Sequence, residues 1–413
     1  MLKISTFETR FIDSEGRQRI FNGMNLCDKG YHVPGNERKT YDVPFDENLI
    51  SKLSGYGFNI VRLGLTWDAV EPQPNQYDEK YLDKIQKVAD LCEKYGIYFF
   101  LDMHQDLYGG TVDTPADGAP AWACLTDGAK FKPTRIVWAE GYFWGKAIHN
   151  CFDNFWADKE YNGVPLQTYF CNMWKHVAER FKDHPALFGF DILNEPFPGS
   201  DGGKIFRKLI MNVAKTVITD KRCKKLEMLR NLVTGNAIKC LDPFDDPSLF
   251  RKVTSAGDEL IHKFDTGAYS KFINKTAKAI REVTDNGIII MENSYYSNLG
   301  IPYSAPAVNY DGKREEKLCF APSSTAQGHL ISFGKPIGSA LNSLFNFKDE
   351  YPIQIRGKIQ VKENIHNGIL RNKPITNFLI LVSASLFSTF VIFISLAILY
   401  PSFLNSHSSW SGP

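Results

Sequence analysis

Short apolar segments alternate with helical patterns along the first 292 residues of this 413-residue chain, and this alternation constrains the fold most strongly. Strand, helix and strand in repeating order favour right-handed βα units around a parallel sheet, so we predict the α/β class. The apolar segments that suit buried strands are residues 18–26, 58–65, 97–102, 186–193 and 288–291. The helical patterns cover residues 46–55, 78–95, 172–181 and 269–283.

The overall composition excludes several classes of function. Hydrophobic residues make up 43% of the chain and charged residues 23%, which is typical of a globular protein. Lys and Arg number 48 against 46 Asp and Glu, and the formal charge of +2 gives no field that attracts nucleic acid. The sequence has no Gly-rich phosphate loop, which disfavours nucleotide binding. The binding partner therefore has to be inferred from local residues.

The cysteines indicate neither a metal centre nor a cellular compartment. The eight cysteines form no CxxC pair and have no His partner at zinc-site spacing, so we expect no structural metal. An even number permits disulfide bonds, but a reducing compartment tolerates the same number. The first 21 residues carry charges in every turn, so we expect no signal peptide in the chain as given.

Polar side chains stand at the ends of the predicted strands. Arg62 lies inside the second strand, Asp102 and His104 end the third, and Asn194 and Glu195 follow the fourth. In a closed barrel of βα units the carboxyl ends of the strands meet on one face. These residues are therefore expected to converge, although about 130 residues separate Arg62 from Glu195. Their convergence predicts an active site rather than a structural core.

The tripeptide Asn194-Glu195-Pro196 is the sharpest of these strand ends. A glutamate fixed at a strand end suits a general acid/base when a partly desolvated pocket raises its pKa towards neutrality. The same tripeptide also suits a plain turn. The sequence LDMHQD at the previous strand end favours the catalytic interpretation.

Five separated segments between about Phe11 and Pro322 carry a family pattern. They are VRLGLTWDAVEP, LDMHQDLYG, DGAPAWA, CFDNFW and FGFDILNEPFPG. Together they resemble glycoside hydrolase family 5, and specifically its endoglycoceramidase-like and glucosylceramidase-like branch. The resemblance implies a (β/α)8 TIM barrel and a retaining O-glycosyl hydrolase that cleaves β-glycosidic bonds of glycosphingolipids. Two carboxylates and water suffice for that reaction, so neither a metal nor an organic cofactor is implied.

The resemblance also implies roles for individual residues. Glu195 resembles the general acid/base, and Asn194 resembles the residue that hydrogen-bonds the sugar at the reacting unit. Arg62 resembles the arginine that keeps the nucleophile ionised. From the residues alone, Arg62 also has the alternative of a buried salt bridge.

Three further residues resemble parts of the glycan site. His104 resembles a polar wall of the reacting subsite, and Lys29 and Asp102 resemble residues that contact the glycan. His104 has the alternative of a core histidine bonded to a backbone carbonyl. Lys29 has the alternative of an ordinary solvated loop lysine.

A cluster of aromatic residues falls in the long excursion between residues 105 and 167. As a binding wall it would stack on sugar faces or hold a lipid chain, and as a satellite core it would fill the space beneath a long loop. The sequence leaves both alternatives open. The cluster consists of Trp122, Trp138, Tyr142, Phe143, Trp144, Phe152, Phe155 and Trp156.

The sequence does not identify the second carboxylate that retaining hydrolysis needs about 5 Å from the first. In the family this residue follows the seventh strand. Cys319 to Pro322 begins like the sixth strand, but Ser323-Ser324-Thr325 stands where the family has a histidine and a nearby tyrosine. Glu292 ends the fifth strand, and we interpret it as a structural or subsite residue. The nucleophile is therefore unassigned.

The last part of the chain departs from the family pattern. We divide the chain into a partial barrel at residues 1–322, incomplete at strands 6–8, an unassigned linker at 323–377 and a polar tail at 401–413. Between linker and tail, Phe378 to Tyr400 is a run of 23 residues without a charge, long enough for a transmembrane helix. Two basic residues shortly before this run would keep the barrel on the cytoplasmic side. A buried helix is the alternative.

Three functions follow from these observations. The first is a retaining glycosidase that acts on glycosphingolipids, of the endoglycoceramidase or glucosylceramidase type. The second is a catalytically inactive, truncated barrel that binds glycan or lipid, because the nucleophile is not identifiable. The third is a membrane-anchored scaffold in which the barrel motifs are unused.

Overall fold

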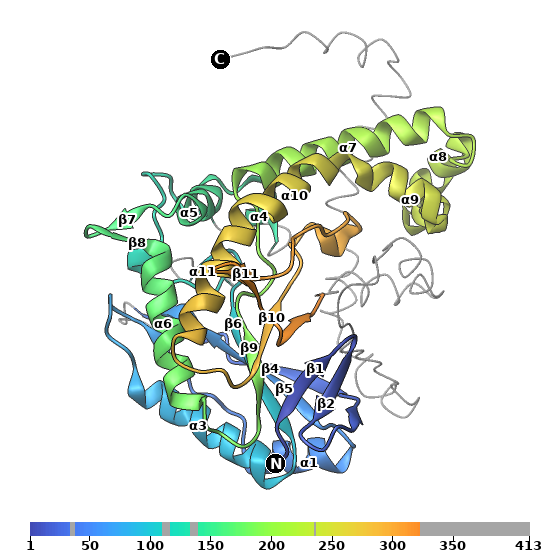
Figure 1. Cartoon of the computed structure of the whole chain (residues 1–413). Coiled ribbons are helices and arrows are strands. Elements are labelled where there is room, and N and C mark those ends of the chain that lie inside the picture. The colour runs from blue at the N-terminus through green and yellow to red at the C-terminus, as the bar shows by residue number, and fades with distance from the viewer. Residues whose placement is uncertain (34–37, 110–115, 133–138, 235–236, 323–413) are drawn as a thin grey trace.

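A computed structural model describes residues 1–322 except 34–37, 110–115, 133–138 and 235–236. The centre of the molecule is a six-stranded sheet in the order β13-β10-β9-β6-β5-β4, and all its pairs are parallel (Figure 1). Consecutive barrel strands therefore lie side by side, as in a (β/α)8 barrel. The six strands are β4 (Gly23–Cys27), β5 (Ile60–Thr66), β6 (Tyr98–His104), β9 (Leu187–Asp191), β10 (Ile288–Met291) and β13 (Leu318–Phe320).

Helices pack against the sheet and also form two excursions from it. The helices that connect successive strands are α1 (Glu47–Gly55), α2 (Trp67–Val70), α3 (Glu79–Lys94), α6 (Leu166–Phe181) and α11 (Ser270–Arg281). The excursions carry α4 (Glu140–Trp144), α5 (Lys146–Trp156), α7 (Ser200–Thr219), α8 (Lys225–Val233), α9 (Pro247–Thr254) and α10 (Asp258–Phe264). A π-helical turn, Asp265–Tyr269, joins α10 to α11.

Short antiparallel pairs complete the described fold. A three-stranded sheet consists of β1 (Ile4–Phe7), β2 (Arg10–Asp13) and β3 (Gln18–Arg19). The two hairpins are β7 (Glu160–Tyr161) with β8 (Val164–Pro165), and β11 (Asn309–Tyr310) with β12 (Lys313–Arg314).

The predicted alternation of strands and helices is confirmed along the described chain. The helical pattern at residues 78–95 forms α3, whose first turn is capped by the Asp78 side chain, which accepts a hydrogen bond from the Tyr81 N–H at 3.0 Å. The chain leaves this helix through Gly96, whose φ of 69° is in the left-handed region that favours glycine. The helix therefore begins and ends where the signals in the sequence predicted.

The parallel sheet is open within the described ranges. β4 and β13 are its edge strands, and among the residues described neither pairs with a further strand. The prediction of a barrel is confirmed for the first six strands, and β13 shows that the sixth strand is formed, whereas the sequence predicted gaps from this strand onwards. The predicted linker, transmembrane helix Phe378–Tyr400 and polar tail lie outside the described residues. None of the helices in the described ranges is long and apolar enough to cross a membrane.

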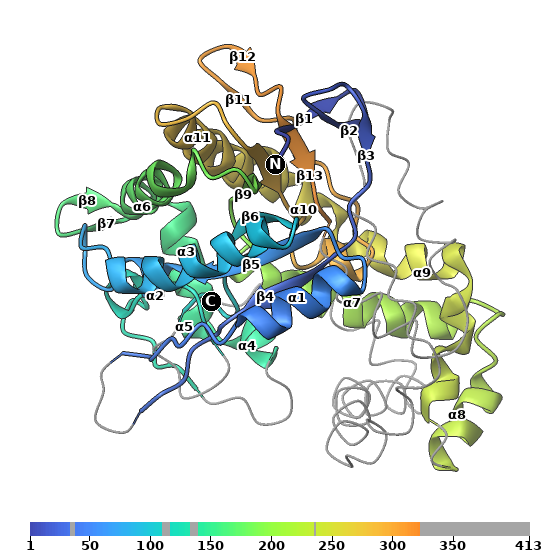
Figure 2. The ribbon, with the colours of Figure 1, turned by 90° about the horizontal axis from the view of Figure 1, so that it is seen from below.

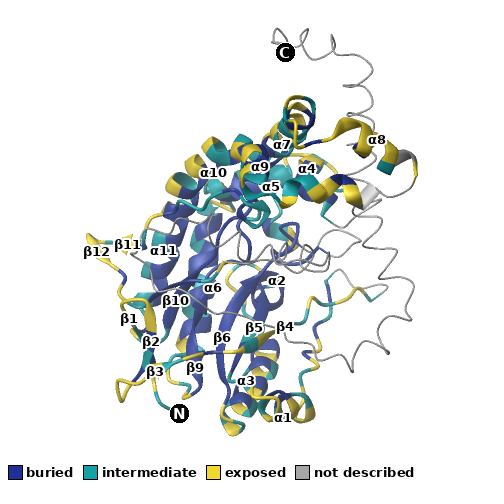
Figure 3. Cartoon of the chain, turned by 90° about the vertical axis from the view of Figure 1, so that its right-hand side faces the viewer, coloured by how far each residue is buried: buried dark blue, intermediate teal, exposed yellow. Residues whose placement is uncertain are grey.

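The inner face of the sheet has an apolar layer at the amino-terminal ends of the strands. Phe100, Phe188 and Ile290 belong to this buried layer, and the β1–β3 sheet adds Phe11, whose ring lies 5.2 Å from that of Phe188. In the view from below, β1 lies next to β13 (Figure 2). The middle strands are buried on both faces (Figure 3). At the carboxyl ends the inward positions carry charged residues instead.

An irregularity in β9 decides which of its side chains face inwards. Phe99 pairs with Leu187, but the next residue of β6 pairs with Gly189, so Phe188 is an extra residue in the ladder. Phe188 then packs in the inner layer, and Phe190 packs outwards against a tryptophan of α6. Without the extra residue, strict alternation would turn Asp191 outwards. The bulge therefore brings Asp191 to the inner face.

The two excursions lie together beyond the carboxyl ends of the strands (Figure 1). The first excursion, residues 105–165, packs α4 and α5 against α7 of the second excursion. The hydroxyl of Tyr296 ties α7 to the segment after β10 by donating to the Gly202 carbonyl at 2.6 Å. Helix α8 projects far from the sheet and is largely exposed (Figure 3). These excursions form the surroundings of the strand ends.

Candidate active site

Glu195 lies just beyond β9 with its backbone in a conformation that residues other than glycine rarely adopt. Its φ is 42°, in the left-handed region, and the residue is only 4% exposed. The Asn298 side-chain amide donates to Oε1 of Glu195 at 2.8 Å. The Glu195 backbone N–H donates to Oε2 of Glu292 at 2.9 Å. A buried carboxyl at a strand end suits the general acid/base role that the sequence predicts.

The main chain around Asn194 and Glu195 is tied to the end of β6. The Asn194 N–H donates to the Met103 carbonyl, and its side-chain amide donates to the Gln105 carbonyl, both at 3.0 Å. In return, Nε2 of Gln105 donates to the carbonyls of Asn194 and Glu195 at 3.0 and 3.2 Å. The structure therefore brings the third and fourth strand ends together, as the sequence predicted.

The inward side chains at the carboxyl ends of the strands form a charged layer, which contains Asp102, Asp191 and Glu292. Arg62 of β5 lies at its centre. Its Nη2 lies 2.7 Å from Oε1 of Glu292 and 2.8 Å from Oδ1 of Asp102. Nη2 also donates to the Asn194 amide oxygen, and Nε donates to Oδ2 of Asp191, both at 3.0 Å. Burial by itself lowers the pKa of Arg62, but the three carboxylates outweigh burial and raise this pKa above its usual value. The guanidinium therefore stays charged and links four strand ends.

The charged layer holds more acids than Arg62 can neutralise. Burial raises the pKa of Asp191 to about 6, although Arg62 opposes this shift. Burial also raises the pKa of Glu292 well above its ordinary value, with Arg62 again opposing and Asp191 and Asp102 adding to the shift. Because these carboxyls share one guanidinium, their titrations are coupled, and the pKa of each is raised by burial beside the other acids.

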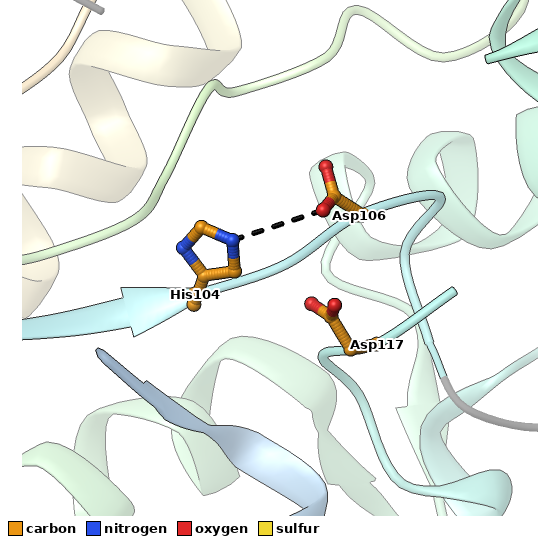
Figure 4. Close-up of side chains that lie close together, drawn as sticks. All are labelled: His104, Asp106 and Asp117. Carbon is orange, nitrogen blue, oxygen red and sulfur yellow. Dashed lines mark ion pairs between the residues drawn. The ribbon is translucent and has the colours of Figure 1, made fainter. Parts of the chain in front are cut away.

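A second charged group lies beside the first and contains Lys29 and His104. The His104 imidazole has Nδ1 2.8 Å from Oδ2 of Asp102 and Nε2 3.7 Å from Oδ2 of Asp106. Lys29 forms an ion pair with Asp106, and its Nζ lies 3.4 Å from Oδ2 of Asp117. The side chains of His104, Asp106 and Asp117 point towards one another (Figure 4). Lys29 is thus a paired residue of the site rather than a solvated loop lysine.

The residue types of this second group are those that hold metal ions. His104, Asp106 and Asp117 each offer one ligand atom, and these atoms lie within 4.8 Å of one another. However, the ammonium group of Lys29 already lies against both aspartates. A lysine in this position supplies the positive charge that a cation would bring, so the group is explained as an ion-pair network without a metal.

His104 makes the stability of the protein depend on pH. Burial by itself lowers the pKa of His104, but Asp102 and Asp106 outweigh burial and raise it to about 10. A histidine whose folded-state pKa exceeds its unfolded value of about 6.5 contributes stability that is complete below that value and is lost as the pH rises through about 10. We therefore expect the free energy of unfolding, measured by urea denaturation, to fall across this window.

The matched variant for this prediction is His104→Gln, which keeps a donor towards Asp102 but does not titrate. Other groups also titrate between these pH values, so the difference between wild type and variant isolates His104. We expect this difference to shrink as the pH rises. A difference that stays constant across the window would contradict a protonated His104.

Asp102 lies between Arg62 and His104. The residue is fully buried, and its two carboxylate oxygens face Arg62 and His104 at 2.8 Å each. A carboxylate enclosed in this way holds Arg62 and His104 in place, and its contact with a glycan stays a prediction. Asp106, two residues further along the chain, faces Lys29 at the rim instead.

The aromatic cluster of the first excursion is mainly a satellite core. Tyr142 is 0% exposed, and the rings of Phe152 and Phe155 are also buried. Trp122 and Trp156 are partly buried, and Trp144 is 55% exposed. Trp138 lies outside the described residues. The core alternative is therefore correct for most of the cluster, and Trp144 is the described member that best suits a binding wall.

Several residues of the site were not singled out from the sequence. Asp106, Asp117 and Asp191 all stand in the quoted motifs, so the motifs carried a signal that the assignment of single residues missed. Gln105 is also in a motif, but its hydrogen bonds to the chain around Glu195 require the fold. Asn298 follows no strand pattern, and nothing in its sequence surroundings indicates its contact with Glu195.

The parallel βα sheet places a buried glutamate after its fourth strand, beside an asparagine and an arginine–carboxylate network, and this arrangement agrees with the class of protein that the sequence motifs resemble. The family described as Cellulase (glycosyl hydrolase family 5) matches residues 13–225, which is more than half of the chain. The chain belongs to this family.

Curated relatives name the activities found among similar proteins. An endoglycoceramidase of Hydra vulgaris is 32% identical over 215 residues, which is 46% of this chain and 39% of that protein. An endoglycoceramidase of Cyanea nozakii is 30% identical over 224 residues, 48% of this chain and 42% of that protein. A glucosylceramidase of Rhizopus delemar is 25% identical over 245 residues, 46% of this chain and 35% of that protein. The chain thus spans about two fifths of the length of these relatives.

A solved structure is similar in fold. Endo-glycoceramidase II from Rhodococcus sp., in a complex with ganglioside GM3, superimposes with a TM-score of 0.58 at 22% identity. The match covers 82% of this chain and 64% of that chain. At this identity the likeness supports the barrel fold.

Proposed function

We propose that this protein hydrolyses β-glycosidic bonds of glycosphingolipids with retention, and that Glu195 is the general acid/base. The observation that carries the proposal is the buried Glu195 carboxyl at the fourth strand end, next to the Arg62 network. The endoglycoceramidases and the glucosylceramidase among the relatives support this substrate class.

In the proposed reaction the Glu195 carboxyl donates its proton to the glycosidic oxygen as the bond to the sugar breaks. The resulting carboxylate then accepts a proton from the water that releases the sugar. Retention requires a second carboxylate about 5 Å away, which we leave unassigned. Glu292 has both carboxylate oxygens engaged, by Arg62 and by the Glu195 N–H, which disfavours it as the nucleophile.

We assign the glycan contacts to the second charged group. Lys29 is 45% exposed at its side chain and is paired with Asp106, so this pair offers both donors and acceptors to sugar hydroxyls. His104 lies behind the pair, and Asn194 lies beside Glu195 as the partner of the reacting sugar. Asp106 thus takes the place that the sequence assigned to Asp102.

The second excursion supports a lipid-linked substrate. Large apolar side chains on and beside it are exposed, including Trp144 at 55%, Met211 at 59% and Leu226 at 84%. Exposed apolar groups on the excursions suit a ceramide chain or a membrane surface. Membrane association through Phe378–Tyr400 remains part of the proposal.

Purified protein incubated with lactosylceramide and with glucosylceramide tests the proposal. Mass spectrometry is expected to detect free ceramide together with lactose for an endo-acting enzyme, or with glucose for a glucosylceramidase. The control is an α-configured fluorogenic glucoside, which a β-specific site leaves intact. Absence of both hydrolysis and calorimetric binding would contradict the proposal.

The second candidate function is binding of glycan or lipid without turnover. The observation that favours it is the engagement of both oxygens of Glu292, the glutamate that Arg62 holds. Calorimetric binding of the same lipids without release of ceramide would identify this function.

A further inference from the structure

We propose that Glu292 and Asn298 are positioning residues for Glu195, and that Asn298 directs the catalytic proton to Oε2 of Glu195. The inference rests on the proposed role of Glu195 as the general acid/base. It concerns the segment after β10, which the sequence did not connect with the acid/base.

The segment after β10 holds Glu195 at two points. Glu292 accepts a hydrogen bond from the Glu195 backbone N–H at 2.9 Å, and Asn298 donates its side-chain amide to Oε1 of Glu195 at 2.8 Å. The two partners are 97 and 103 residues away from Glu195 along the chain. One contact fixes the main chain and the other fixes the carboxyl group.

The backbone of Glu195 needs such support. A φ of 42° is unfavourable for a side chain with a Cβ, and residues in this region persist only where their surroundings hold them. Gln105 contributes from one side by donating to the Glu195 carbonyl. Glu292 contributes from the other side by accepting from the N–H, so both polar groups of this peptide residue have a partner.

Asn298 also distinguishes the two carboxyl oxygens. In a protonated carboxyl group the carbonyl oxygen is the better acceptor, and the amide of Asn298 donates to Oε1. The proton is therefore favoured on Oε2, from which it passes to the glycosidic oxygen as the bond to the sugar breaks. A flip of the carboxyl group would sacrifice this hydrogen bond.

Glu292 connects this support to the charged layer. Its other oxygen, Oε1, accepts from Arg62 at 2.7 Å, so the same side chain joins the arginine to the acid/base. The Tyr269 hydroxyl donates to the Glu292 carbonyl at 2.7 Å and fixes the segment from the helix side. Glu292, Tyr142 and Tyr295 are among the ionisable groups near Glu195.

The test uses Asn298→Ala and Glu292→Gln in the full chain, with Glu315→Gln as the control. Glu315 is also buried and is paired with Arg281, but it lies at the β11–β12 hairpin outside the site. The first measurement is a pH titration of the Glu195 carboxyl by carbon-13 NMR, with the signal identified by its loss in Glu195→Gln. This measurement needs no turnover.

We expect Asn298→Ala to raise the titration midpoint of Glu195 by about one pH unit, because a donor to the carboxylate is lost. Glu292→Gln is expected to shift the midpoint too, and Glu315→Gln to leave it unchanged. An unchanged midpoint in folded Asn298→Ala would overturn the proposal. A shifted midpoint in a chain that turns over no glycoside supports the positioning role and counts against the proposed function instead.

The second measurement compares β-glucosides with poor and good leaving groups. Misplacement of the acid is expected to reduce kcat/KM about 100-fold for the poor leaving group and much less for a dinitrophenyl glucoside, which needs little acid assistance. Equal losses for both substrates in Asn298→Ala and Glu292→Gln would show a merely structural role.

Discussion

Replacing Glu195 by Gln is expected to lower kcat/KM for β-glycosides with poor leaving groups by about 10² to 10⁴-fold. Gln is nearly isosteric and keeps an acceptor for Asn298, but it has no proton to give to the glycosidic oxygen. The free energy of unfolding is expected to change little, because the backbone contacts of residue 195 with Glu292 and Gln105 remain.

A comparison of substrates with good and poor leaving groups distinguishes the loss of the general acid from misfolding. Hydrolysis of a dinitrophenyl glycoside is expected to retain its first step, and added azide is expected to restore turnover because it needs no general base. Glu315→Gln provides the matched control for loss of a buried glutamate. Ceramide release at the wild-type rate by Glu195→Gln would contradict the assignment of the acid/base.

Arg62→Met is expected to lower the free energy of unfolding at neutral pH by about 3 to 5 kcal/mol, the usual cost of breaking a buried ion pair. The substitution leaves the carboxyls of Asp102, Asp191 and Glu292 without their shared partner. Since burial already raises the pKa of Asp191 to about 6, protonation relieves part of the repulsion in acid. The loss is therefore expected to be smaller at about pH 5 than at about pH 8.

Urea denaturation of wild type and variant at the two pH values measures this effect. Arg180→Met is the matched control, because Arg180 also contacts two acids, Glu79 and Asp83, but both are more than half exposed. Its removal is expected to cost about 1 kcal/mol or less. Equal costs for the two arginine variants would show that the Arg62 network does not depend on its burial.

The sequence predicted the elements and the strand ends because both depend on local patterns. Apolar periodicity located the first five strands of the sheet, and polar residues at their ends located Arg62, His104, Asn194 and Glu195 on one face. Lys29 joined this face as the family resemblance implied. The pairing of these residues was not predictable, because the Arg62 contacts with Asp191, Asn194 and Glu292 join positions 129 or more residues apart in the chain.

At two positions the side-chain direction depends on the fold and not on the local sequence. Asp191 faces inwards only because the ladder of β9 gains an extra residue at Phe188, and strict alternation predicts the opposite direction. Asp102 and Asp106 are both polar residues near one strand end, and the sequence does not tell which of them is enclosed. The fold decides that question, because it encloses Asp102 between Arg62 and His104.

The division of the inner face into two layers has a consequence for protein engineering. Phe11, Phe100 and Phe188 fill the apolar layer through contacts between their rings. Their side chains carry no polar group that could join the charged layer. Repacking the apolar layer offers a route to higher thermal stability that leaves the electrostatics of the charged layer intact. The charged layer carries buried acids in excess, so substitutions that stabilise the protein there would reduce the proposed catalytic activity.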